Sequence, residues 1–439
     1  MKKVIVILLI FSLVFISFFL FKKEEEKENE NISIIIETNE GNIEASTYPD
    51  KEYYEYSNIN CKNTSDNIYV NFNKETWKLN LSVEEEKVDG NFNCIVHFKQ
   101  RNRLGTEVIT SKYKENNTEG LIKLNQPETE QTPALVEYRY SGSNNEVKNY
   151  VEFNNEIWRI IGVSPVDDGT GKYEDRIKIV REESIGEYSW DTSEKGINDY
   201  TDTAGNYYNG AGINQWGESG DYEGADLMRL LNPGYENESI NNSLYWNRES
   251  GTCFIDGYYT EAKTTSCNFS STGLTSDAKS MIDDAKWYAS AVDQSGVTAL
   301  ISYQQERGNR TGIADVGITV KKTINWVGKV GLIYESDYAY ASSECYKDVY
   351  LYDSNNGQDY SLKKCTSSNW ILNDKYIVMF NPTSWSYCVI RRSFPSGVVG
   401  SGLTRNSTSQ SIRPAVYLKE NIKITGGNGT IENPYKVEI

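Results

Sequence analysis

Histidine is almost absent from this chain, since His97 is the only one in 439 residues. In the segment Cys94-Ile95-Val96-His97-Phe98, alternation places Cys94, Val96 and Phe98 on one strand face and His97 on the other, solvent-facing side. A nucleophile activated by histidine and a histidine-ligated metal centre are therefore not expected. No C-x-x-C pair occurs either, which removes the zinc and redox motifs built on that spacing.

Positive charge is also in deficit, with 45 Lys and Arg against 62 Asp and Glu, a net charge of −17. This balance argues against a nucleic-acid partner and against adhesion to anionic lipid. Acidic residues are dense in residues 182–226, but the sequence contains neither a twelve-residue EF-hand pattern nor the calcium triplets of sugar-binding lectins. We expect solvated acidic loops there, and no metal or cofactor, although Ca²⁺ is kept as the alternative.

One long apolar run is present, VIVILLIFSLVFISFFLF at residues 4–21. Its eighteen residues would span roughly 27 Å as a helix, close to the hydrocarbon thickness of a bilayer. The run passes directly into Lys22 without an A-x-A-like cleavage site. We therefore predict a cytoplasmic N-terminus at residues 1–3 and an uncleaved transmembrane anchor at residues 4–21. A cleaved signal peptide is the alternative.

Seven cysteines follow the apolar run, and six of them fall into neighbouring pairs. The expected local bridges are Cys61–Cys94, Cys253–Cys267 and Cys345–Cys365, with Cys388 left over. Six cysteines allow 15 pairings, so the sequence does not settle the connectivity. Disulfides form in oxidising compartments. Together with the anchor, they predict a single-pass protein of the cell membrane whose C-terminal part is extracellular.

The rest of the chain divides by composition into four segments. Residues 22–31 are a charged stalk. Short alternating strands, a cysteine pair and one core tryptophan predict a small all-β, Ig-like domain at residues 32–124. The run NQPETEQTPA at residues 125–134 is typical of a linker. Residues 135–439 are expected to form a larger domain, so that the fold class is α+β.

Local patterns predict several elements of the larger domain. Two asparagines at positions 154 and 155 separate two apolar segments and indicate a hairpin. Helical spacing after Ser276 predicts a second, longer helix. The expected elements are a hairpin at 150–153 and 157–161, strands at 176–180 and 330–334, and helices at 225–231 and 276–291.

Several segments occur in an order that resembles a family of uncharacterised bacterial surface proteins with an N-terminal membrane helix and a small Cys-paired β domain. They are YVEFNNEIWRIIGV, ADLMRLLNPGYE, WVGKVGLIYESDYAYAS, NWILNDKY and IRPAVYLKENIKITGGNGTIENPY. The terminal RPA-type strand is also similar to the C-type-lectin-like fold of the formylglycine-generating-enzyme branch. The resemblance implies that fold for residues 135–439. Those enzymes use a cysteine pair, and Cys388 has no free partner if Cys345 and Cys365 bridge, so that activity is not expected.

An aromatic and basic group late in the chain is the candidate ligand-binding surface. Trp, Tyr and Arg dominate recognition hot spots. Its residues are Trp385, Tyr387, Arg391, Arg392 and Arg405. The expected function is non-enzymatic binding of an unknown extracellular protein or glycan, in adhesion or recognition. The alternatives are a cell-wall or glycan-modifying enzyme that uses a carboxylate pair, and a structural component of the cell envelope.

Overall fold

The computed structural model describes the chain from Ile32 to Ile439 with gaps. The described residues are 32–38, 41–43, 48–62, 68–83, 92–115, 120–144, 146–192, 199–201, 207–209, 216–218, 224–255, 263–293, 297–309, 325–344, 351, 368–372, 375–383, 389–397, 399–403 and 410–439. Within them the protein is α+β, with strands predominating over helices, as the sequence predicts. The predicted segments 1–3, 4–21 and 22–31 lie outside the described residues. Among the residues that are described, no helix has the length and apolarity to cross a membrane.

The chain forms two compact units, Met1–Asn102 and Arg103–Ile439. The boundary lies earlier than the predicted linker at 125–134. Strand β7 (Leu121–Gln126) pairs with β8 (Leu135–Tyr140), so the run between them is a connection inside the second unit. It is held locally because the Thr129 and Thr132 hydroxyls are 2.8 Å apart and both side chains are buried. Such side-chain bonds order a polar segment that its composition alone marks as flexible.

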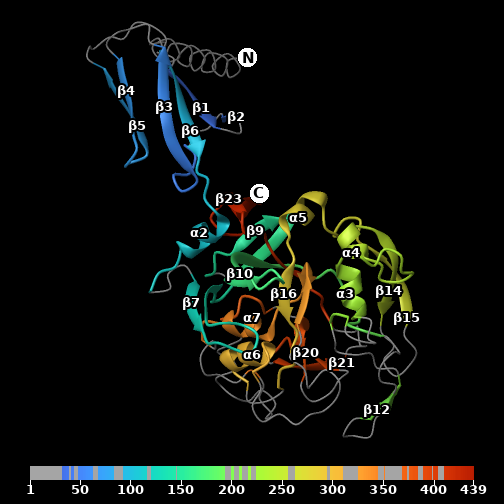
Figure 1. Ribbon diagram of the computed structural model, residues 1–439. Helices are drawn as coiled ribbons and strands as arrows, with labels where there is room; N and C mark the ends of the chain where they lie inside the picture. The colour runs from blue at the N-terminus through green and yellow to red at the C-terminus, as the bar shows by residue number, and fades with distance from the viewer. Residues whose placement is uncertain are drawn as a thin grey trace, which may run out of the picture. The chain divides into compact units, whose positions relative to one another are not determined.

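The first unit contains a four-stranded sheet and a hairpin (Figure 1). The sheet order is β2 (Gly41–Ile43), β1 (Ile32–Thr38), β6 (Phe92–Gln100) and β3 (Tyr54–Lys62), with β1 and β6 parallel. Strands β4 (Ile68–Asn73) and β5 (Lys78–Val83) form the hairpin. Phe72 of β4 packs against Val96 and Phe98 of β6, so the core lies between the sheet and the hairpin.

The predicted face of β6 is confirmed, since Cys94, Val96 and Phe98 are buried. His97 is on the other face, half-buried, with its Nε2 3.2 Å from Asn60 Nδ2. The predicted Cys61–Cys94 disulfide is present and joins directly paired residues of β3 and β6. It therefore lies within one sheet, whereas the bridge of an immunoglobulin domain joins two sheets. The bridge of this unit thus differs from the one an Ig-like sandwich would carry.

A nine-stranded sheet organises the second unit. Its main path is β18-β22-β11-β10-β9-β24-β23, and β8 pairs with β10 and β7 beside it. The bounds are β9 Tyr150–Phe153, β10 Glu156–Asp167, β11 Tyr173–Arg181, β18 Val330–Gly331, β22 Ala415–Tyr417, β23 Lys423–Gly426 and β24 Tyr435–Glu438. The predicted β9–β10 hairpin is confirmed. Its two loop residues, Asn154 and Asn155, have φ of 59° and 60°, the left-handed values that a two-residue hairpin turn requires.

Short helices lie among these strands (Figure 1). They are α2 Gly105–Thr110, α3 Asp226–Leu231, α4 Leu244–Asn247, α5 Ser276–Met281, α6 Ala299–Glu306 and α7 Glu335–Tyr340. Helix α3 matches the prediction for 225–231. The helix predicted at 276–291 is wrong beyond Met281, because β16 (Ala285–Tyr288) pairs there with β17 (Asn325–Gly328). The strand predicted at 330–334 is only the two-residue β18, because its pairing with β22 is confined to Val330 and Gly331.

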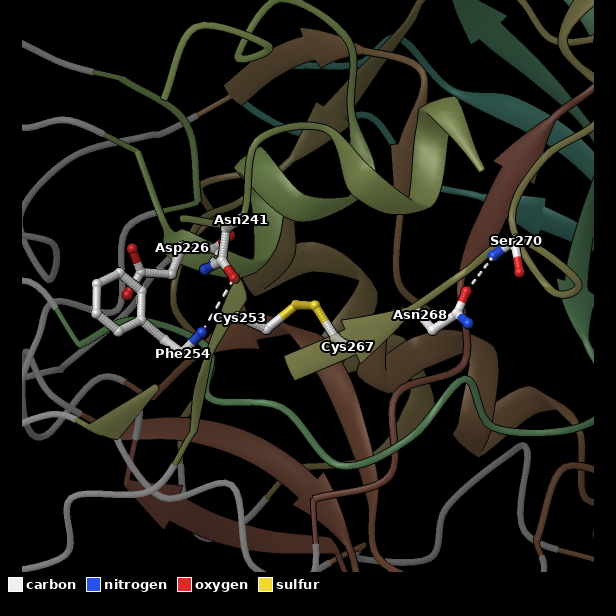
Figure 2. The surroundings of a disulfide bond; sticks show 7 residues. All are labelled: Asp226, Asn241, Cys253, Phe254, Cys267, Asn268 and Ser270. Atoms are coloured by element: carbon white, nitrogen blue, oxygen red, sulfur yellow. Dashed lines mark hydrogen bonds between the residues drawn. A yellow bond between two sulfur atoms is a disulfide. The ribbon is translucent and has the colours of Figure 1, made fainter. Parts of the chain in front are cut away.

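Three small sheets complete the described part of this unit. They are β12 (Asp199–Thr201) with β13 (Tyr207–Asn209), β14 (Ser250–Ile255) with β15 (Lys263–Asn268), and β19 (Ile377–Pro382) with β20 (Val389–Ser393) and β21 (Val399–Leu403). The predicted Cys253–Cys267 disulfide joins β14 to β15 (Figure 2). Beside it, Phe254 N donates to Asn241 Oδ1 at 3.1 Å, and Asn241 Nδ2 donates to Asp226 O at 3.2 Å. These bonds tie the bridged hairpin to the start of α3.

Candidate functional site

Two of the five predicted binding residues lie on β20. Arg391 and Arg392 are neighbours on this strand. Trp385, Tyr387 and Arg405 lie outside the described residues, as do Cys345, Cys365 and Cys388. Of the five predicted residues, Arg392 is the one whose side-chain surroundings are described.

Arg392 contacts two aromatic rings that also contact each other. Its guanidinium carbon is 4.6 Å from the ring centre of Tyr376 and 5.1 Å from that of Phe394, and Nε donates to Ser401 O at 3.1 Å. The two rings contact each other edge to face with centres 5.0 Å apart. All three side chains are half-buried. We call Tyr376, Arg392 and Phe394 the arginine platform. It combines a pre-oriented cation with two adjoining aromatic rings, a composition typical of recognition sites.

Trp370, another tryptophan of the late chain, has a structural role. It is 2% exposed, and its Nε1 donates to Tyr140 O at 2.8 Å. Arg159, which is fully buried, lies with its guanidinium carbon 4.9 Å from the Trp370 ring. Trp370 is therefore part of the core and does not extend the platform.

A second unusual site is a group of charged side chains inside the second unit. Its members are Glu137 and Arg139 on β8, Lys178 on β11, Glu306 and Arg307 at the end of α6, and Asp337 on α7, all buried. We call these residues the buried ion cluster. Buried charges are stable only when they are paired and hydrogen-bonded.

Ion pairs and hydrogen bonds link the members of the buried ion cluster. Lys178 Nζ is 2.5 Å from Asp337 Oδ2, and Arg139 donates to Asp337 Oδ1. Arg139 Nε also donates to Glu137 Oε2 at 2.9 Å. Arg307 Nη1 pairs with Glu306 Oε2 at 3.0 Å, and Glu306 accepts from Ser336 N and Oγ. The cluster thus connects strands of the central sheet to α6 and α7.

Local structure explains why Lys178 and Asp337 meet. Asp337 is in the first turn of α7, where its Oδ2 accepts from Tyr334 N at 2.8 Å. An acidic side chain in this position stabilises the helix start. Lys178 lies in the middle of β11, with its Nζ 3.8 Å from the ring centre of Tyr334 and 4.9 Å from that of Trp287. The amine thus contacts aromatic rings as well as a carboxylate.

Burial shifts the pKa values of this cluster. It lowers the pKa of Lys178 to about 8 although Asp337 opposes the change. It raises the pKa of Glu306 to about 7, against the charge of Arg307 and the hydrogen bonds from Ser336. Burial would also raise the pKa of Asp337, but the charges of Lys178 and Arg139 outweigh it and lower that pKa. Two groups of the cluster therefore titrate near neutral pH.

A small cavity adjoins the Lys178–Asp337 pair. Its wall consists of Tyr138, Arg139, Ile161, Gly162, Val163, Ser164, Lys178 and Asp337. Gly162 lets β10 approach β8 closely at this wall, because a β-carbon on residue 162 would be 2.1 Å from Tyr138 O. Within the described ranges, no group of three or more His, Cys, Asp or Glu side chains is placed to hold a metal ion.

The sequence analysis missed the buried ion cluster. The signal available was a lysine inside the apolar strand Ile177-Lys178-Ile179-Val180, where only a buried partner would make it stable. The partner is 159 residues away in the chain, and strand alternation does not reveal it.

No family model, no curated protein and no solved structure matches the chain. The geometry of the arginine platform and of the buried ion cluster therefore carries the functional argument.

Proposed function

We propose that this chain is a membrane-anchored, non-enzymatic binding protein of the bacterial cell surface, with residues 4–21 in the membrane. It recognises an extracellular protein or glycan through the arginine platform. The observation that carries the proposal is the half-buried Arg392, whose guanidinium lies against the adjoining rings of Tyr376 and Phe394. Trp385, Tyr387, Arg391 and Arg405 complete the proposed surface.

The disulfides support the extracellular location. Cys61–Cys94 lies in the first unit and Cys253–Cys267 in the second, so both units carry a bridge. Structural disulfides persist in oxidising compartments and are rare in the cytosol. An extracellular position for both units requires an export signal, and the apolar run at residues 4–21 has the composition of one.

The platform suits recognition because its geometry is set before a ligand arrives. Stacking on two rings and the bond to Ser401 O restrict the Arg392 side chain, which reduces the entropy lost on binding. A guanidinium offers paired donors to a carboxylate, and aromatic faces accept apolar or sugar surfaces. In the buried ion cluster, by contrast, Glu137, Glu306 and Asp337 are each bonded to a cation, which is not the arrangement of a glycosidase carboxylate pair.

The test is an array of extracellular proteins and glycans probed with the full chain in lipid nanodiscs. A specific ligand is expected, and Arg392→Ala should weaken its binding about 30-fold, the effect of losing a hot-spot side chain worth about 2 kcal/mol. The matched control is Arg248→Ala, which removes a guanidinium bound to Ser270 O at 2.6 Å on another part of the unit. Absence of any specific ligand, or equal losses for the two variants, would contradict the proposal.

A further inference from the structure

Lys178 Nζ and the carboxyl group of Asp337 are close enough to react with each other as well as to form an ion pair. Nζ is 2.5 Å from Oδ2, and the side chains are 4% and 0% exposed. The carboxyl carbon is one bond beyond Oδ2, which brings it near the roughly 3–3.5 Å separation of reacting atoms in a near-attack arrangement.

We infer that Lys178 and Asp337 condense to an intramolecular amide that links β11 to α7. One proton passes from the ammonium of Lys178 to the carboxylate of Asp337. The nitrogen lone pair then forms the Nζ–Cγ bond, the Cγ–Oδ2 bond breaks, and Oδ2 leaves as water with that proton and a second one from Nζ. The amide keeps one hydrogen on Nζ and Oδ1 as its carbonyl oxygen. Ammonium plus carboxylate equals amide plus water, so no oxidant or co-reactant is needed.

Arg139 is placed to assist the addition. It donates to Oδ1, the oxygen on which negative charge collects when Nζ adds to the carboxyl carbon. Because Arg139 Nε is also bonded to Glu137, its guanidinium is already oriented before the reaction. The condensation removes one cation and one anion together, so the net charge of the buried ion cluster does not change.

Glu306 is linked to the pair through Ser336, the residue before Asp337, whose N and Oγ donate to its carboxylate. It also interacts electrostatically with both Lys178 and Asp337. Burial also brings the pKa of Lys178 to about 8, which leaves roughly one amine in ten neutral at pH 7. A neutral amine is the form that attacks.

The enclosure favours the condensed form. Two groups held in contact react with effective concentrations of about 10⁵–10⁸ M, far above those of free lysine and aspartate in water. Condensation also removes two charges from a site where each carries a desolvation penalty. The released water can take the position of Oδ2 and accept from Tyr334 N, or leave through the adjoining cavity. The product would join two elements 159 residues apart without a disulfide.

Peptide mapping of the full chain, purified in detergent, denatured, reduced and alkylated, tests the inference. Trypsin does not cut after an amidated lysine, so residues 177–181 should stay intact and be joined to residues 330–347. The branched peptide should be lighter by one water than the sum of its two parts. Without the amide, cleavage after Lys178 yields 177–178, 179–181 and a linear 330–347. Finding only these free peptides in the wild-type digest would overturn the inference, whatever the variants do.

Two variants complete the test. Lys178→Arg keeps a cation but has no amine, and it should release the linear 330–347 peptide. Lys286→Arg is the control, because Lys286 Nζ and Asp167 Oδ2 form another lysine–aspartate pair, at 3.2 Å, with the lysine 21% exposed. It should keep the branched peptide. A branched peptide that persists in Lys178→Arg would overturn the assignment to Lys178.

Discussion

Because of Glu306, the free energy of unfolding of the second unit should fall as the pH rises from about 4.5 to about 7. Its pKa is raised from 4.5 to about 7, and the largest cause is burial. Between these values the native state binds more protons than the unfolded state, so the free energy of unfolding falls as pH increases. The stabilisation is fully present below about pH 4.5 and is lost above about pH 7. A shift of 2.5 units corresponds to about 3 kcal/mol.

Other carboxylates act in the opposite direction, so the wild-type pH curve alone is not decisive. The pKa values of Glu137 and, in the uncondensed pair, of Asp337 are lowered on balance, which means that the stability they contribute is lost as pH falls. The lowered pKa of Lys178 in the uncondensed pair acts only above about pH 8. The contribution of Glu306 is isolated by comparing the wild type with Glu306→Gln, whose side chain has a similar shape and does not titrate.

The measurement is urea unfolding followed by tryptophan fluorescence, which reports mainly on the second unit because Trp77 is the one tryptophan outside it. From pH 5 to pH 8 the variant should gain about 2.5 kcal/mol relative to the wild type. Glu128→Gln, an exposed site with the same change in charge, should show no such gain. A difference below about 0.5 kcal/mol, or one of opposite sign, would refute the reasoning about a buried protonated carboxyl.

Two further predictions concern the Cys253–Cys267 disulfide and Gly162, which lines the small cavity. Replacing both Cys253 and Cys267 with serine should lower the free energy of unfolding by about 3 kcal/mol, because the bridge closes a short loop with a sequence separation of 14. Urea unfolding measures this, and a loss below about 1 kcal/mol would show that the bridge adds little. Gly162→Ala should cost about 3 kcal/mol or more, since its β-carbon would be 2.1 Å from Tyr138 O. Gly426→Ala, whose β-carbon meets nothing closer than 3.8 Å, is the control, and equal melting temperatures would contradict the prediction.

Features that depend on neighbouring residues were predicted well. The hairpin turn at Asn154 and Asn155 follows from residues that tolerate positive φ. The buried face of β6 follows from strand alternation around Cys94. The bridges Cys61–Cys94 and Cys253–Cys267 join cysteines that are close in sequence. The turn, the strand face and the Cys253–Cys267 bridge are each decided within one element or one hairpin, whereas Cys61–Cys94 joins β3 to β6 across a sequence separation of 33.

Features that depend on distant residues were missed or misplaced. Residues 285–288 have helical spacing, but pairing with Asn325–Gly328 makes them a strand. The first unit ends at Asn102 because β7, at Leu121–Gln126, pairs with β8 of the second unit. Tertiary hydrogen bonds overrode local propensity in both places.

The sequence by itself determined the buried face of β6, the hairpin turn, the net charge of −17 and the scarcity of histidine, since composition and short-range periodicity carry that information. It also indicated two disulfides that the structure contains. Only the tertiary structure decided that Arg392 contacts Tyr376 and Phe394, and that Lys178 meets Asp337. The Lys178–Asp337 contact requires β11 and α7 to pack together across 159 residues of chain. A buried charge shows in a sequence only as an exception to the apolar pattern, and its partner is chosen by the fold.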